Sequence, residues 1–173
     1  MKKILLTEAQ VRLITEEIDK NDSIQKLIFA DTSDIEFVED DSVIPSGIPV
    51  SRGYCRLIPV IDGKEISEQF VRFSAEEVRY NGKTIYQLHI YIAPEIRRLG
   101  VAEKLYTAFI LQGYPACSLY TNRTSSFYRE AGSDVKSDEA IENLWNKIAQ
   151  HPGIAVLPMT RGDKQIGVIG LKK

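Results

Sequence analysis

The sequence predicts a domain of the α/β (α+β) class, and three features of the chain support that prediction. The first is a run of strand-like segments with tight turns between residues 54 and 92. The second is a strand, a basic turn and an amphipathic helix over residues 88–113. The third is a further helix followed by a C-terminal hairpin. This order differs from the strict strand–helix alternation of a doubly wound sheet.

Composition limits the classes of protein to consider. With 173 residues, 43% hydrophobic and 27% charged, the chain suits one globular domain, with or without a small appendage. A formal net charge of −2 does not indicate a nucleic-acid-binding protein, which would carry an excess of basic residues. Two cysteines, Cys55 and Cys117, indicate a reducing compartment and neither a disulfide framework nor a metal site. Without an apolar run of membrane-spanning length or a secretory signal, we expect a cytoplasmic protein with no membrane partner.

Residues 1–30 are predicted to form an N-terminal helical segment. Residues 7–10 form a capping box, and apolar residues follow with helical spacing: Val11, Ile14 and Ile18, then Ile24, Leu27 and Ile28. The segment either packs on its own domain or docks a partner chain. After a short strand at Ile35–Val38, residues 39–53 form an acidic loop. This loop is solvated surface or, if it borders a site, favours a cationic amine.

Signals for an antiparallel meander follow. Asp62-Gly63 and Asn81-Gly82 are turn dipeptides, and the second is the strongest hairpin signal in the chain. Pro59 indicates an edge position or a bulge in its strand, because proline has no N–H to donate. The segments expected as strands are residues 54–61, 69–73, 77–80 and 83–92.

A strand, a basic turn and a helix come next. The helix is expected to open at about Gly100 and to end at Gly113, with one apolar stripe formed by Val101, Leu105, Ala108 and Phe109. Arg97 and Arg98 precede the glycine. Because the N–H groups at a helix start are unpaired and lie at the positive end of the helix dipole, the turn is predicted to bind a phosphate group.

The C-terminal third contains a short apolar strand at Ala116–Tyr120, an Asn-led turn that stops at Gly132, and a helix at 137–150. Segments 154–160 and 165–171 are expected to form a terminal hairpin. Trp145 lies on the apolar face of the helix and is considered as an interface residue.

Two motifs resemble those of the GCN5-related N-acetyltransferase (GNAT) family. The first has the order V-x-P-x-x-R-x-x-G-x-G/A and is matched, with every offset kept, by Ile92, Pro94, Arg97, Gly100 and Ala102. The second has an Asn, a small residue, an aromatic pair and a glycine, and is matched by Asn122, Ser125, Phe127, Tyr128 and Gly132. In the second motif the Asn-to-Tyr spacing is one residue short, and Ser133 replaces the usual aromatic residue.

The resemblance implies a GNAT-like fold over residues 31–173. This fold is a mixed, mostly antiparallel, twisted sheet of six to seven strands with helices on both faces. The helix at about 137–150 would be an insertion.

The resemblance also implies a site for acetyl-CoA as co-substrate, with no metal. Ile90 and Ile92 would pair by main chain with the pantetheine arm, as an added strand does. A splay beside residues 116–120 would admit the thioester, and Asn122 would contact the arm or merely cap a helix. The residues that would surround the pyrophosphate are Arg97, Arg98, Leu99, Gly100, Val101 and Ala102.

In this family pattern Tyr128 would be the general acid that protonates the leaving thiolate. His89 is the candidate base, because its ordinary pKa suits proton abstraction near neutrality. Tyr86 lies near the position where the family often has an acid, but tyrosine is a poor base at pH 7. Ordered water is the other route for the proton. Cys117 is expected in the core rather than as a nucleophile.

The function implied is transfer of an acetyl group from acetyl-CoA to a primary amine acceptor, a small molecule or a protein, by direct attack. The alternative is a catalytically retired GNAT-like module that acts in binding or assembly, including as a phage structural protein. In either case the N-terminal or inserted helix is a candidate surface for a homodimer or a partner chain.

Overall fold

The computed structural model describes residues 22–40, 54–120 and 136–173. Predictions for the N-terminal capping box, for most of the acidic loop, and for Asn122 and Tyr128 therefore lie outside the described residues.

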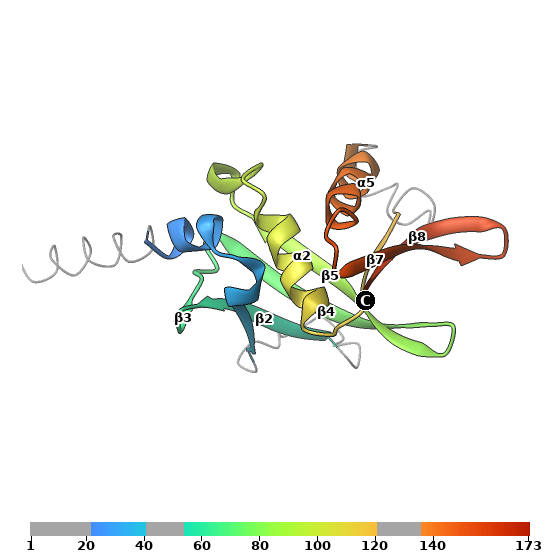
Figure 1. Cartoon of the computed structure of the whole chain (residues 1–173), viewed down its shortest axis with the longest axis horizontal. Coiled ribbons are helices and arrows are strands. Elements are labelled where there is room, and N and C mark those ends of the chain that lie inside the picture. Colours follow the sequence, from blue (N-terminus) through green and yellow to red (C-terminus); the bar gives the residue numbers. More distant parts are fainter. Residues whose placement is uncertain (1–21, 41–53, 121–135) are drawn as a thin grey trace, which may run out of the picture.

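The described chain forms an open sheet of eight strands in which every neighbouring pair is antiparallel except β5 and β6 (Figure 1). Along the sheet the order is β1-β2-β4-β5-β6-β8-β7, and β3 pairs with β2. This confirms a mixed α+β architecture with a mostly antiparallel sheet. The short β3 takes the strand count beyond the predicted six to seven. The strand bounds are β1 Ile35–Glu39, β2 Tyr54–Ile61, β3 Lys64–Glu65, β4 Val71–Tyr80, β5 Lys83–Ile92, β6 Ala116–Leu119, β7 Ile154–Arg161 and β8 Lys164–Lys172.

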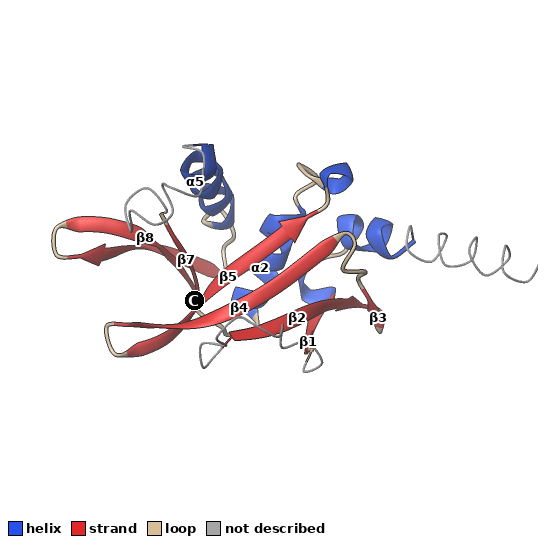
Figure 2. Cartoon of the chain, turned by 180° about the vertical axis from the view of Figure 1, so that it is seen from behind, coloured by secondary structure: helices blue, strands red, loops and turns tan. Residues whose placement is uncertain are grey.

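The described helices lie on the same face of the sheet (Figures 1 and 2). They are helical residues 22–29, α2 (Val101–Leu111) and α5 (Lys136–Ile148), with the single turns η1 (Thr32–Asp34) and η2 (Pro94–Ile96). Within these residues the expectation of helices on both faces is wrong. Strand β6 and the β4–β5 and β7–β8 hairpins instead share a second apolar cluster, formed by Ile85, Cys117, Met159 and Ile169.

The turn predictions are confirmed. Asp62, Gly63, Asn81 and Gly82 all have positive φ, as two-residue hairpin turns require. The predicted break between two strands at 69–80 is wrong, because β4 is continuous. Its middle residues pair with β2 on one side and with β5 on the other, and this pairing outweighs the weak β propensity of the local sequence.

Pro59 is in register with Phe37 of β1, with no bulge, and β2 is not an edge strand. The prediction of an edge position or a bulge is therefore wrong. The ladder between β2 and β4 ends at Leu57. The Pro59 carbonyl accepts from the Ile66 N–H at 2.8 Å on that side, so the missing N–H of Pro59 faces a place where no ladder bond is formed.

Helix α2 lies across the centre of the main core. The predicted stripe is confirmed, because Val101, Leu105, Ala108 and Phe109 are all buried. The Phe109 ring contacts Phe73 of β4, with the ring centroids 5.8 Å apart. The helix is thus fixed on the sheet by side chains that the 3.6-residue period alone identifies.

Helix α5 packs beside α2 and over β8. The Trp145 ring meets Tyr106 of α2 edge to face, with centroids 5.4 Å apart, and Trp145 is only 2% exposed. Trp145 is therefore a core residue and not an interface residue. A Cβ added at Gly170 would lie 2.6 Å from Ile110 Cδ1 and 2.7 Å from Trp145 Cζ3. Glycine in β8 lets both helices approach the sheet.

Replacing Gly170 by alanine should lower the free energy of unfolding by about 1–3 kcal/mol, because the methyl group overfills the contact among three elements. Urea denaturation of Gly170→Ala measures the effect. Lys172→Ala changes an exposed residue of the same strand and should stay within about 0.5 kcal/mol of the parent. Equal stability of both variants would contradict this account of the packing.

Candidate functional site

The candidate site begins where β5 and β6 separate. These parallel strands pair only at Tyr86 with Ala116 and at Gln87 with Cys117. Beyond that point β6 continues alongside β8 to Leu119, while β5 runs on to Ile92. One edge of the second half of β5 is therefore not paired with β6.

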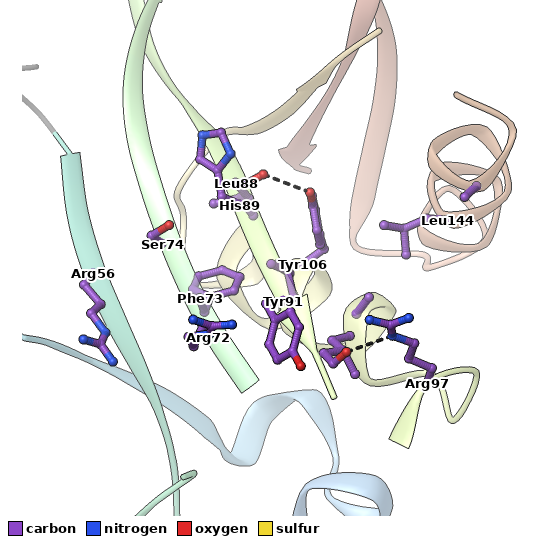
Figure 3. Close-up of a pocket in the computed structure, with 14 residues that line it drawn as sticks. Arg56, Arg72, Phe73, Ser74, Leu88, His89, Tyr91, Arg97, Tyr106 and Leu144 are labelled. Carbon is purple, nitrogen blue, oxygen red and sulfur yellow. Dashed lines mark hydrogen bonds between the residues drawn. The ribbon is translucent and has the colours of Figure 1, made fainter. Parts of the chain in front are cut away.

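A groove with a volume of about 1120 Å³ follows this edge (Figure 3). Leu88, Ile90 and Ile92 line it from β5. Helices α2 and α5 contribute Ala102, Tyr106, Ala140 and Leu144, and Arg97 lies at the basic turn. The groove also reaches the opposite face of the sheet, where its lining residues are Arg56, Arg72, Ser74, His89 and Tyr91.

The main chain of β5 is directed into this groove at every second residue. The Tyr86 N–H donates to the Pro115 carbonyl at 2.8 Å, so the N–H and C=O groups of Leu88, Ile90 and Ile92 face the same side. The Leu88 carbonyl accepts from the Tyr106 hydroxyl, and the Ile92 carbonyl accepts from Arg97 Nε at 2.9 Å. Ile90 keeps both main-chain groups toward the groove, with no register partner there among the described residues.

The basic turn at the end of this edge has a left-handed backbone. Arg98 has φ 66° and Gly100 has φ 78°, and Gly100 is the N-cap of α2. Because glycine has no side chain, it cannot cap the first helical N–H groups, which remain for a ligand. Val101 is buried and anchors the helix start, whereas Leu99 is 47% exposed. The predicted turn is thus open and positively charged.

Tyr106 closes the inner end of the groove, and no motif in the sequence points to it. Its hydroxyl lies 3.4 Å from the Leu88 carbonyl of β5 and 3.3 Å from Ser118 Oγ of β6. A phenol has one proton. If that proton goes to the carbonyl, the Ser118 hydroxyl donates to Tyr106. Burial raises the pKa of Tyr106 to about 12, so the hydroxyl stays protonated and joins the separating strands. In the sequence, Tyr106 lies four residues before Ile110 on an apolar helix, and that spacing indicates only a core residue.

On the opposite face, His89 lies beside Glu76. His89 Nε2 lies 3.5 Å from Glu76 Oε2, and the imidazole is 45% exposed at the groove. Because the carboxylate faces Nε2, the other ring nitrogen is available to accept a proton. The structure thus places His89 at the groove with an orienting acid that sequence spacing did not indicate.

Other candidate residues lie away from the groove. Tyr86 contacts Phe109 and Tyr114 in a smaller cavity, and burial raises its pKa above the ordinary value. Cys117 is fully buried, and burial raises its pKa to about 12, which confirms its place in the core.

Comparisons with protein-family models, curated proteins and solved structures find no match to this chain. No helix within the described ranges is long and apolar enough to cross a membrane. The same residues contain no cluster of three or more side chains suited to holding a metal ion.

Removing the Tyr106 hydroxyl should destabilise the protein by about 1–2 kcal/mol, because Tyr106→Phe leaves Leu88 and Ser118 without a partner in a buried site. Thermal or urea unfolding tests this. Tyr114→Phe removes a hydroxyl from a half-exposed ring and is the matched control. A Tyr106→Phe protein as stable as the control would show that the link between β5 and β6 contributes nothing.

Proposed function

We propose that this protein is an N-acetyltransferase that moves an acetyl group from acetyl-CoA to a primary amine. The observation that carries the proposal is one continuous feature. The edge of β5 that does not pair with β6 leads to the open turn at Gly100, where α2 begins. A coenzyme with an amide-bearing arm and a diphosphate needs these two kinds of partner in this order.

The edge suits the pantetheine arm because it offers main-chain donors and acceptors. An extended amide chain can add to it as a further strand, with Ile90 supplying both an N–H and a C=O. The divergence that the GNAT resemblance implies beside residues 116–120 has a counterpart in the separation of β5 and β6. Both features support the proposal.

The turn suits the diphosphate because it combines uncapped N–H groups with cations. Main-chain N–H groups of residues 98–102 would donate to phosphate oxygens, at the positive end of the α2 dipole. Arg97 lines the groove and has guanidinium donors beyond the Nε that bonds Ile92. No metal is required for this binding.

The reaction proposed is direct attack. The amine nitrogen bonds to the thioester carbonyl carbon while a proton leaves the nitrogen for His89, directly or through water. The tetrahedral intermediate then collapses. The carbon–sulfur bond breaks, and the thiolate takes a proton, for which Tyr128 is the proposed donor. Asn122 is proposed to contact the coenzyme arm.

The alternative is a module that keeps the fold without the chemistry and serves binding or assembly. One observation favours this alternative. The Tyr106 hydroxyl already donates a hydrogen bond to the Leu88 carbonyl, which faces the groove and would otherwise be open to a coenzyme. Coenzyme binding separates the two proposals, since a retired module needs no acetyl-CoA.

Acetyl-CoA should stabilise the protein by about 2.7 kcal/mol at 100 times its dissociation constant. Gly100→Glu should abolish this gain, because a carboxylate fills the turn and repels phosphate. Thermal unfolding with and without acetyl-CoA measures both.

Gly82→Glu is the control for this experiment. Gly82 has φ 76° and Gly100 has φ 78°, and neither has an atom within 4 Å of an added Cβ, so the two variants carry equal backbone strain. The two variants should therefore differ only in their stabilisation by acetyl-CoA, which Gly82→Glu keeps and Gly100→Glu loses. If millimolar acetyl-CoA does not shift the parent protein, the acetyltransferase proposal is wrong.

Replacing His89 by glutamine should lower kcat/KM for the amine about 100-fold or more and leave acetyl-CoA stabilisation intact, because only proton transfer is lost. Release of free thiol measures turnover. His151→Gln, which changes the other histidine of the chain, should leave turnover unchanged. Full activity of His89→Gln would assign proton removal to water.

A further inference from the structure

The groove has a polar side that the coenzyme proposal does not use. On the sheet face away from α2, Arg72 of β4 is the register partner of Tyr91 of β5. Arg72 Cζ lies 4.3 Å from the centroid of the Tyr91 ring, and both residues line the groove (Figure 3). Stacking on the ring reduces the freedom of the guanidinium and leaves its in-plane N–H donors available.

The basic side chains of this groove differ in whether a carboxylate lies beside them. Arg56 forms ion pairs with Asp40 and Glu68, and His89 pairs with Glu76. Arg72 has no carboxylate within ion-pair distance among the described residues. It is thus a pre-oriented cation whose charge is not balanced by a described acid.

Arg72 and His89 lie on the same face at neighbouring positions. His89 is in register with Ser74, and Arg72 with Tyr91, so the two are diagonal neighbours across the β4–β5 ladder. Such residues have Cα atoms about 7–8 Å apart, within the reach of long side chains. A small molecule can therefore place an amine at His89 and an anion at Arg72 together.

We infer that the acceptor is a small amine that also carries a carboxylate, which Arg72 binds through its guanidinium fork. The planar fork matches a carboxylate in a two-point contact. The inference rests on the proposed acetyltransferase function. It replaces the cationic acceptor suggested by the acidic loop with an amino acid or a similar compound.

Arg72 is assigned to the acceptor rather than to the coenzyme because of the side of the sheet it occupies. The coenzyme turn, with Arg97 and Ala102, lies where β5 meets α2. The side chains of Ile90 and Ile92 pack into the core on that face, whereas His89 and Tyr91 alternate to the other face. An amine entering from the Arg72 face thus reaches the edge of β5 opposite the helices.

The test uses amines in matched pairs. Glycine, β-alanine, 4-aminobutyrate and several L-amino acids are each compared with the corresponding carboxamide, which keeps the amine and removes the charge. With saturating acetyl-CoA, free-thiol release should show a kcat/KM about ten-fold or more higher for the carboxylate member of the preferred pair.

Arg72→Gln should remove that preference by raising KM for the carboxylate, and should leave both kcat and acetyl-CoA stabilisation nearly unchanged. Arg72→Lys should restore only part of it, because an ammonium lacks the two-point fork. Arg79→Gln, which removes an exposed arginine of the same strand away from the groove, is the control and should keep the full preference.

A binding measurement accompanies turnover. Protein saturated with free coenzyme A is heated with each amine, and the preferred amino acid should stabilise it more than its carboxamide does.

Three results would overturn the inference: equal use of both members of every pair, no stabilisation by any carboxylate amine, or a loss of acetyl-CoA binding in Arg72→Gln, which would assign Arg72 to the coenzyme. The proposed function fails separately, by the absence of any acetyl-CoA binding in the parent protein.

Discussion

Most features of the site follow from the short pairing between β5 and β6, which covers only two residues of each strand. Parallel strands joined by a crossover helix normally continue side by side, and each then satisfies the other's main chain. Here β6 pairs with β8 over its whole length, and β5 is left with an edge. The groove, the outward-facing groups of Ile90 and the position of the basic turn all follow from that separation.

Buried polar side chains stabilise the separation at its inner end. Leu88 and Ser118 lie on the diverging strands, and the hydroxyl of Tyr106 lies between them. Without this hydroxyl, the Leu88 carbonyl would lose its hydrogen-bond partner within the protein, which is costly for a buried polar group. Tyr106 also contacts Trp145, so the same side chain joins the strand divergence to the packing of α5.

The strand β5 divides the groove into two chemical environments. The apolar side chains of Leu88, Ile90 and Ile92 face the helices. His89 and Tyr91 alternate with them and face the open side, where β4 supplies polar partners. A strand alternates its side chains between two faces, so one segment can separate a site for a long apolar arm from a site for a charged acceptor. The proposed reaction joins the two across the edge of the strand.

Local patterns in the sequence predict the apolar stripe of α2, the hairpin turns at Asp62-Gly63 and Asn81-Gly82, and the turn at Gly100 that precedes α2. Each follows from side-chain period or from backbone conformations that a few residue types accept. The point at which β5 and β6 separate, the burial of Trp145, and the pairs His89–Glu76 and Arg72–Tyr91 are visible only in the tertiary structure. These depend on strand register and on the order of strands in the sheet, which arise from packing over the whole core and not from any local pattern.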